Sequence, residues 1–464
     1  MTGVSSGLGS RYRLGKKVIR AGEMFRVYYK YSACIKVCTD DIAILCDPWL
    51  GGNAYEGTWG QYPPVKDARK LVGNFDAIYI SHIHPDHYCA ESIAHLFGFY
   101  GPKPIWIADW GNQPNYLAKK IESDGLGEHL KTFSELEIGD TLVNIVPNKT
   151  DSLSDIDSAL IVTSRKTGQS VLNINDCVHN EKFAQSLNRL RSDLDIEYSL
   201  FCLGYTGAGP YPQTYYSPIT EKNTLLKKAR DKKQQFFERY KKAIGSIPSV
   251  KRLPFAGKYV LKGDLSMLNQ YRGVADALEV KEFDENAIVL DDGGEAYFDI
   301  ETMEASCERK VEYALPDQFP TDQDYRWRSS INFIPSDSLL KRLLIKSVKN
   351  AHAKSECADN FYWSIYPYEN PSEIIDIWST SKPWENRRPI LSFNCNKNLN
   401  PLEISSAIPV AHSHMFIEKK ALFAVLTGVA HWNNYEVGSV CQVRRVPDQH
   451  QPEMQSFLNF CSVI

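Results

Sequence analysis

In the first half of the chain, apolar residues fall into short runs separated by polar and turn residues. A helix is predicted at residues 88–99, where apolar positions recur at helical spacing. Strands are predicted where the runs are rich in β-branched and aromatic residues, at 27–38, 42–47, 75–81, 103–108, 141–147, 158–164 and 170–176. Strands interleaved with helical segments indicate helices packed on sheets, which is an α/β architecture.

The pattern changes at Ser217, where a long polar and basic stretch begins. Ser217 suits the N-cap position and Gly245 suits the end, so a helix is predicted over residues 217–245. This segment carries more Lys and Arg than Asp and Glu. The excess fits either a solvated helix face or a basic rim that attracts an anionic substrate.

The last part of the chain differs in texture from the first. Residues 287–300, with Asp292 and Gly293 at the turn, predict a hairpin. A chain of 464 residues is too long for one ordinary core. We therefore expect a boundary near residue 275, with an α/β domain at 1–275 and an α+β accessory domain at 276–464.

Composition narrows the classes of partner. A net charge of -3 gives no electrostatic footprint for nucleic acid or an anionic membrane, so neither partner is expected. The sequence contains no run of about 18 apolar residues, so no membrane-spanning helix is predicted. The 11 cysteines form no C-x-x-C pair, which is typical of reduced thiols, and we expect a cytoplasmic protein.

The segment YISHIHPDHYCAES, residues 79–92, concentrates candidate chemistry. His82, His84, Asp86 and His87 lie within six positions directly after a predicted strand. Neutral imidazoles and carboxylates are the usual ligands of Zn²⁺ and Fe²⁺. A polar surface loop without metal is the alternative, but the cluster favours a metal site at a sheet edge.

These residues resemble the signature of the metallo-β-lactamase superfamily. ILCDPWLGG at 44–52 resembles the Asp-containing strand before that signature, and Asp176 resembles its later aspartate that bridges two metals. The resemblance spans at least residues 35–210 and implies an αββα sandwich with one or two divalent metal ions, zinc or iron, at one edge. By that comparison His82 and His84 would hold the first metal, Asp86 and His87 the second, and Asp176 both.

The chain departs from the superfamily pattern where two further histidines are usual. Neither residues 144–162 nor residues 203–215 contain a histidine. Side chains that could substitute are Asn148, Thr150, Asp151, Asp155 and His179. The site is therefore expected to be oxygen-rich, mononuclear or partly degenerate.

A narrower resemblance is to the non-Rieske part of CMP-N-acetylneuraminate hydroxylase-like proteins. It rests on segments 46–64, 204–216, 254–273 and 425–439. Those enzymes oxidise a sugar nucleotide and also carry a Rieske iron–sulfur domain bound by Cys and His pairs. This sequence has no C-x-H with a downstream C-x-x-H, so that route of electron entry is expected to be absent.

Two other segments are weaker candidates. The glycine-rich residues 206–212 could let backbone amides approach a phosphate, or could simply shape the edge of a site. His412 and His414 alternate as on a strand, which puts both on one face. Metal binding is not expected there, because no acidic or cysteine partner lies nearby in the sequence.

The favoured hypothesis is a metal-dependent hydrolase. A metal-activated water would attack a small substrate, including phosphorylated or nucleotide-linked molecules, with Asp86 as the catalytic general base. The alternative is an iron-dependent oxygenase acting on a small molecule such as a sugar nucleotide, with a separate reductase as partner. The third is a non-catalytic scaffold with a degenerate metal site, and a homodimer is compatible with all three.

Overall fold

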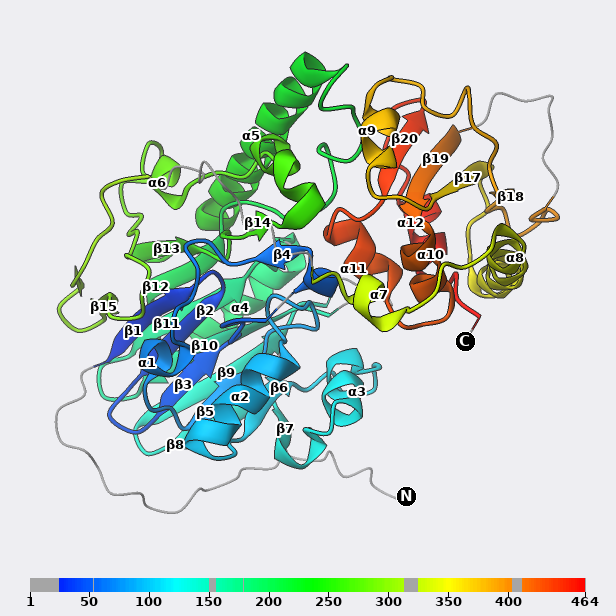
Figure 1. The fold of residues 1–464 in the computed structure, drawn as a ribbon. Coiled ribbons are helices and arrows are strands. Elements are labelled where there is room, and N and C mark those ends of the chain that lie inside the picture. The colour runs from blue at the N-terminus through cyan, green and yellow to red at the C-terminus, as the bar shows by residue number, and fades with distance from the viewer. Residues whose placement is uncertain are drawn as a thin grey trace.

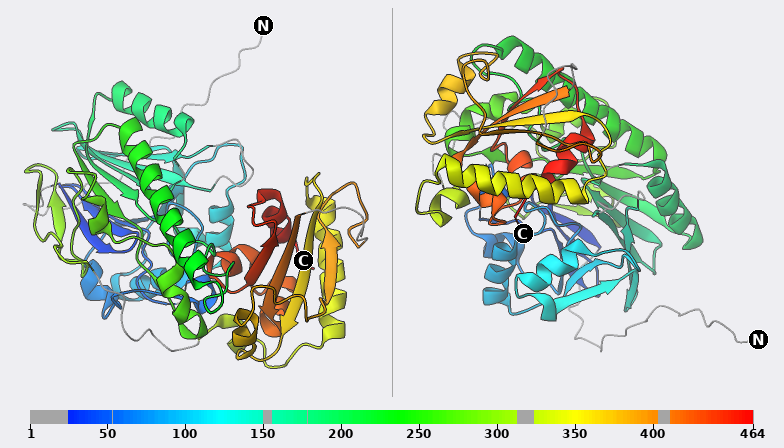
Figure 2. Two further views of the ribbon diagram at one scale, coloured as in Figure 1. Left: turned by 90° about the horizontal axis from the view of Figure 1, so that it is seen from above. Right: turned by 90° about the vertical axis from the view of Figure 1, so that its right-hand side faces the viewer.

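The structure is a computed structural model that describes residues 25–52, 54–149, 156–177, 179–312, 324–402 and 411–463. Two sheets stack in its N-terminal part, with helices on both outer faces (Figure 1). A smaller unit, coloured yellow to red, lies beside them, and the view from above in Figure 2 shows the same arrangement.

The first sheet has eight strands in the order β16-β15-β1-β2-β3-β5-β6-β7. The strands from β3 to β7 run parallel, and the pairs from β16 to β3 are antiparallel. Their bounds are β1 (Arg26–Tyr31), β2 (Cys34–Cys38), β3 (Ala43–Cys46), β5 (Ala77–Tyr79), β6 (Ile105–Ala108), β7 (Leu130–Phe133), β15 (Tyr297–Asp299) and β16 (Glu304–Ala305).

The second sheet has six strands in the order β13-β12-β11-β10-β9-β8. Its β11, β12 and β13 run parallel, while β8 to β11 are antiparallel. Their bounds are β8 (Glu135–Ile138), β9 (Thr141–Pro147), β10 (Ser158–Ser164), β11 (Gln169–Asn175), β12 (Glu197–Gly204) and β13 (Lys251–Phe255).

Successive apolar side chains of one strand point to opposite faces, which explains why both faces of each sheet are covered. On β3, Ile44 packs between the sheets, whereas Leu45 faces the outer helices. On β10, Leu160 packs between the sheets and Ile161 faces outward. Because successive side chains point to opposite faces, such runs need apolar neighbours on both. The predicted αββα sandwich is confirmed.

Helices form the two outer layers of the sandwich. The first sheet packs against α2 (Ala90–Tyr100) and α3 (Tyr116–Ser123), with α1 (Ala68–Val72) and η2 (Gly127–His129) nearby. The second sheet packs against α4 (Glu181–Asp193) and α5 (Lys222–Ser246). Connecting elements are η1 (Tyr55–Gly57), β4 (Trp59–Gly60), β14 (Val260–Leu261), η3 (Gly263–Tyr271) and α6 (Ala277–Val280).

The C-terminal unit is α+β, as expected. Its four-stranded sheet has the order β18-β17-β19-β20. The strands are β17 (Phe361–Tyr368), β18 (Leu391–Asn394), β19 (Ala411–Glu418) and β20 (Gln442–Val446). The helices are α7 (Arg326–Ser330), α8 (Asp337–Lys354), α9 (Glu373–Trp378), α10 (Lys419–Leu426), α11 (Trp432–Val437) and α12 (Pro452–Asn459).

Two local predictions differ from the structure. The hairpin expected at 287–300 is replaced by pairing of β15 with β1 and β16. The helix expected from Ser217 begins at Lys222, because the Ser217 hydroxyl accepts hydrogen bonds from the amides of Ile219 and Thr220 in a separate turn.

The boundary near residue 275 stays a prediction. Since β15 and β16 belong to the first sheet, we favour a boundary after Ala305. In the parts of the chain that the structure describes, no helix has both the length and the apolar character needed to cross a membrane.

Candidate metal centre

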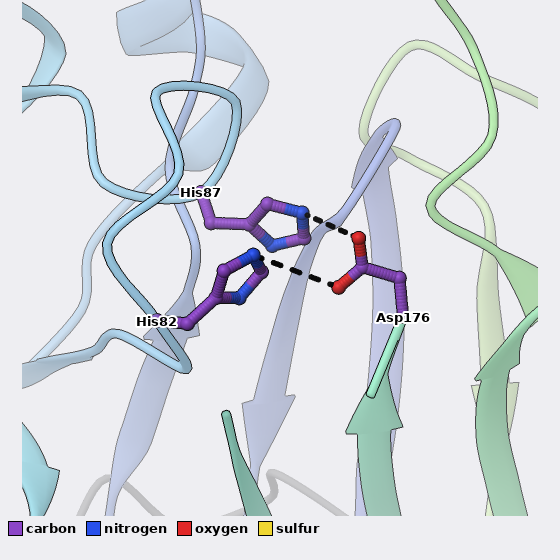
Figure 3. Close-up of side chains that lie close together, drawn as sticks. All are labelled: His82, His87 and Asp176. Carbon is purple, nitrogen blue, oxygen red and sulfur yellow. Dashed lines mark ion pairs between the residues drawn. The ribbon is translucent and has the colours of Figure 1, made fainter. Parts of the chain in front are cut away.

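The candidate site lies where strands of both sheets end. His82 and His87 belong to the loop after β5, and Asp176 directly follows β11 of the other sheet (Figure 3). The carbonyl of His84 accepts hydrogen bonds from the amides of His87 (3.0 Å) and Tyr88 (2.8 Å). This tight turn brings His87 back beside His82, with ring centroids 4.0 Å apart.

Three side chains converge most closely. His82 Nε2 lies 3.8 Å from Asp176 Oδ1, and His87 Nε2 lies 3.5 Å from Asp176 Oδ2 (Figure 3). One ligand atom of each residue lies within 4.8 Å of the other two. His82 and His87 are buried, whereas the Asp176 side chain is 34% exposed.

His84 and Asp86 adjoin this group. His84 Nδ1 lies 2.9 Å from His82 Nε2, and Asp86 Oδ2 lies 3.5 Å from His87 Nε2. Two nitrogen ligands held roughly 2.0–2.1 Å from one metal at roughly 90–110° lie about 2.9–3.4 Å apart. The His82 and His84 nitrogens therefore have the spacing of two ligands of one ion. All five residues predicted from the sequence lie together, and their role as ligands stays a prediction.

The hydrogen-bond network fixes which nitrogen each buried imidazole can offer. Ser81 Oγ donates to Asp47 Oδ2 (2.8 Å), so it accepts from His82 Nδ1 (2.9 Å). His87 Nδ1 donates to Asp47 Oδ2 at 3.2 Å. We therefore assign a proton to Nδ1 of each ring, so that Nε2 is the nitrogen that His82 and His87 can each offer to a metal.

Asp47 orients this site without being among the predicted ligands. It is fully buried, follows β3 with φ of 44°, and accepts further hydrogen bonds from the amide of Ser81 (2.8 Å) and from Asn175 Nδ2. Carboxylates in this position fix the orientation of ligating histidines and increase their basicity. The Asp-containing segment ILCDPWLGG was the signal for this residue in the sequence.

Tyr55 was missed by the sequence reasoning. Its hydroxyl, in η1, donates to Asp86 Oδ1 at 2.7 Å. Burial and the charge of Asp86 raise the pKa of Tyr55 well above its ordinary value, so the hydroxyl remains a donor. Asp86 is left with Oδ2 toward His87.

Electrostatics divide the cluster into two kinds of group. Burial and the neighbouring His82 lower the pKa of His84 to about 3, so this ring is neutral. Burial opposes protonation of His87, but the charges of Asp176 and Asp86 raise its pKa well above the ordinary value. Burial likewise opposes ionisation of Asp176, yet His87 and His82 hold its pKa far below the usual range. The carboxylates of Asp86 and Asp176 thus stabilise a positive charge placed beside them, and a bound metal cation would carry such a charge.

The residues that could substitute for the two missing histidines differ in where the structure places them. Asn148 Oδ1 accepts a hydrogen bond from Asn180 Nδ2 at 2.6 Å. His179 Nε2 lies 3.4 Å from Ser246 Oγ at the end of α5, so this ring is turned to the helix. Thr150, Asp151 and Asp155 lie outside the described residues. A carboxylate not considered from the sequence, Asp157, lies 4.0 Å from His82 Nδ1.

Residues 26–192 match the family model of the beta-lactamase superfamily domain. This part of the chain is a beta-lactamase superfamily domain. The match covers both sheets up to β11 and all five predicted site residues, so the recognition from the sequence is confirmed. With the His–Asp cluster, it supports one or two divalent metal ions, zinc or iron, as cofactors.

The superfamily domain has relatives among hydroxylases. The chain is 25% identical over 257 residues to cytidine monophosphate-N-acetylneuraminic acid hydroxylase of Danio rerio, covering 52% of this chain and 39% of the relative. It is 27% identical over 223 residues to a candidate Rieske 2Fe-2S iron-sulfur protein of Mycolicibacterium smegmatis, covering 46% and 40%. The chain thus spans about two fifths of the length of these curated relatives.

The chain also has similarity to solved structures at low identity. They include a possible metal-dependent hydrolase from Veillonella parvula, 16% identical with a TM-score of 0.38 over 58% of this chain and 98% of that one. They also include CmlA, a diiron beta-hydroxylase from Streptomyces venezuelae, 14% identical with a TM-score of 0.37 over 57% and 53%. Likeness at this level carries no argument about function.

Proposed function

We propose that this chain is an iron-dependent oxygenase that hydroxylates a small anionic molecule of the sugar-nucleotide class. The observation that carries the proposal is the hydroxylase relationship of the domain that holds the His–Asp cluster. The sequence alone favoured hydrolysis. The curated relatives favour the oxygenase alternative instead, because their printed activity is hydroxylation.

The donor set suits this proposal. The three imidazoles of His82, His84 and His87 lie with the carboxylates of Asp86 and Asp176. Mixed imidazole and carboxylate ligands with open positions are typical of non-haem iron centres. Iron bound there would supply the activation of dioxygen.

The chain's own residues would prepare the site. Asp47 and Ser81 hold His87 and His82 with their Nε2 lone pairs turned inward. Tyr55 occupies Asp86 Oδ1 and leaves Oδ2 toward His87. Asp86 is then a ligand in this proposal, and its role as a general base belongs to the hydrolytic alternative.

The reaction also requires an electron donor. Conversion of a C–H bond to an alcohol by dioxygen releases one water and consumes two electrons and two protons. A Rieske-type iron–sulfur protein or domain is the donor we propose, because such a protein is among the curated relatives.

The test starts from protein purified without oxygen or chelator, with its metal content measured. Iron-loaded protein is then given CMP-N-acetylneuraminate, a reductant and ¹⁸O-labelled dioxygen, and the product is examined by mass spectrometry. We expect one labelled oxygen in the product, and none with the same chain loaded with zinc. Release of CMP without dioxygen would instead establish hydrolysis. Absence of bound metal after loading would leave only the scaffold hypothesis.

A further inference from the structure

Helix α5 buries one of its lysines. Most of its basic side chains are exposed, but Lys232 is only 7% exposed. Its Nζ has no hydrogen-bond partner among the described residues. A buried ammonium group without a partner is costly, so its position calls for a counter-charge or for loss of its proton.

A second buried cation, Arg272, lies near Lys232, since the residue after it approaches the carbonyl of Ala229 one turn before that lysine. Arg272, directly after η3, is 2% exposed and donates from Nε to the carbonyl of Asn269 at 3.4 Å. Its guanidinium carbon lies 4.2 Å from the ring centroid of Tyr259, and its Nη1 has no partner in the described ranges. No carboxylate of the described part of the chain forms an ion pair with either side chain. Two like charges are therefore buried together.

Burial and the charge of Arg272 lower the pKa of Lys232 to about 7. The lysine is thus poised between a neutral form, which needs no partner, and a charged form, which an anion would stabilise. Since no carboxylate of the described residues pairs with Lys232, the counter-charge of the charged form would come from a ligand.

The packing around this pair points back to the metal centre. A Cβ at Gly273 would lie 2.4 Å from the carbonyl of Ala229, one turn before Lys232. A Cβ at Gly207 would overlap the ring of Phe236, one turn after it. The segments around Gly207 and Gly273 therefore press on the face of α5 that carries Lys232. The first of them starts at Gly204, where a Cβ would lie 3.4 Å from Asp176 Cβ.

A series of stacked aromatic rings also connects Arg272 to the metal centre. The Tyr259 ring under Arg272 stacks on Trp59 at 3.4 Å, and Trp59 packs on Tyr55 at 4.3 Å. Tyr55 in turn donates to Asp86. The loop that starts at Gly204, beside Asp176, and the aromatic stack that ends at Asp86 thus both connect Lys232 and Arg272 to the metal centre.

We propose that Lys232 and Arg272 form an oxyanion site that binds a phosphate group of the substrate beside the metal centre. A guanidinium offers a planar fork of donors to phosphate, and an ammonium adds a compact charge. The two cations match a phosphate dianion better than a carboxylate. This inference rests on the proposed function only for the identity of the substrate, since the anion site itself requires no turnover.

The test measures binding of inorganic phosphate to the metal-loaded protein by calorimetry. We expect one site per chain, weakened about tenfold or more in both Lys232→Met and Arg272→Gln, because each loses a charge-assisted hydrogen bond. Lys242→Met is the matched control, since this exposed lysine of the same helix lies beside Glu181. Metal content measured on every variant separates loss of the oxyanion site from loss of the metal.

Unchanged phosphate affinity in Lys232→Met, together with higher thermal stability, would show a neutral structural lysine and overturn the inference. Absence of phosphate binding to the wild-type protein would also overturn it. Acetate bound as tightly as phosphate, and lost in the same two variants, would overturn the assignment of a phosphate as the ligand. Failure of the hydroxylation assay with phosphate binding intact would reject the proposed function alone.

Discussion

The chain carries two His-x-His pairs, His82 with His84 beside β5 and His412 with His414 on β19, and the two pairs differ in what surrounds them. In the first, the rings are 82° apart and two nitrogens face each other at 2.9 Å. In the second, the rings stack at 4.3 Å and 22°. A strand places residues two apart side by side, whereas the turn at His84 aims both rings at one point.

The partners of the two pairs differ as well. His412 Nε2 lies 2.8 Å from Ser364 Oγ, His414 Nδ1 lies 3.1 Å from the Tyr366 hydroxyl, and Trp384 stacks on His414. Among the described residues no carboxylate pairs with either ring. Spacing of histidines alone therefore does not bring their nitrogens together with carboxylates, and this convergence distinguishes the first pair.

The largest expected effect is loss of the metal in His84→Ala. Without its Nδ1, one metal position keeps a single imidazole and Asp176, so bound metal should fall to half or less of the wild-type value. His412→Ala is the matched control, because it removes a half-buried histidine of the same spacing. Metal analysis after gel filtration checks both variants, and wild-type stoichiometry in His84→Ala would reject the ligand assignment.

A smaller effect is expected when the orienting carboxylate is altered. Asp47→Asn removes the charge that fixes the Nδ1 proton of His87, and comparable changes weaken metal binding roughly 10–100-fold. Competition with a chromogenic chelator measures this affinity. Ser364→Ala removes the corresponding hydroxyl partner of His412 and should leave metal affinity unchanged. Equal affinities in all three proteins would show that Asp47 serves folding rather than the site.

Tyr55→Phe should have a more local effect. Loss of the hydrogen bond to Asp86 Oδ1 removes a donor from a charged acceptor, a contribution of about 1.5–3 kcal/mol. If Asp86 binds the second metal, that equivalent should weaken roughly tenfold while the first stays bound. Tyr366→Phe removes the hydroxyl that hydrogen-bonds His414 and should change neither metal equivalent. Simultaneous loss of both metals in Tyr55→Phe would mean that the ring supports the whole loop.

Much of this comparison was open to prediction from the sequence. Short apolar runs rich in β-branched and aromatic residues predicted the strands, and burial of both faces of these strands produced the sandwich. The spacing of His82, His84 and His87 after a strand predicted convergence. The lack of an acidic neighbour in the sequence made His412 a weaker candidate, and that judgement stays a prediction. These features are local, and the side-chain periods of strands express them directly.

The contacts that tune the site were not open to prediction in the same way. Tyr55 reaches Asp86 because η1 contains Glu56 in a left-handed conformation, with φ of 60°, and packs against the C-terminal unit. Glu56 accepts a hydrogen bond from Asn434 Nδ2 at 2.9 Å. One hydrophobic core contains Tyr55 together with Tyr435, so the C-terminal unit supports the site from hundreds of positions away. Such non-local packing leaves no period in the sequence.

The burial of Lys232 illustrates the same limit. A basic helix predicts a solvated face, and the sequence does not reveal which lysine turns inward. That choice depends on where the Gly207 and Gly273 segments close over α5. The glycines could be identified as breakers of regular structure, but their common neighbour could not.

The smallest expected effect concerns acid stability of the second pair. Burial lowers the pKa of His414 to about 3, below its ordinary value of 6.5, so the folded protein binds fewer protons there than the unfolded chain. The stability that His414 contributes is fully present above pH 6.5 and is lost as the pH falls toward 3. The loss is at most about 1.4 kcal/mol per pH unit.

His414→Phe keeps the ring against Trp384 and should flatten the decline of the unfolding free energy between pH 6.5 and 5 in urea titrations. His95→Phe, which replaces an exposed histidine of α2, is the matched control. An unaltered slope in His414→Phe would show that this ring is protonated in the folded state, which would make the two histidine pairs more alike than their surroundings indicate.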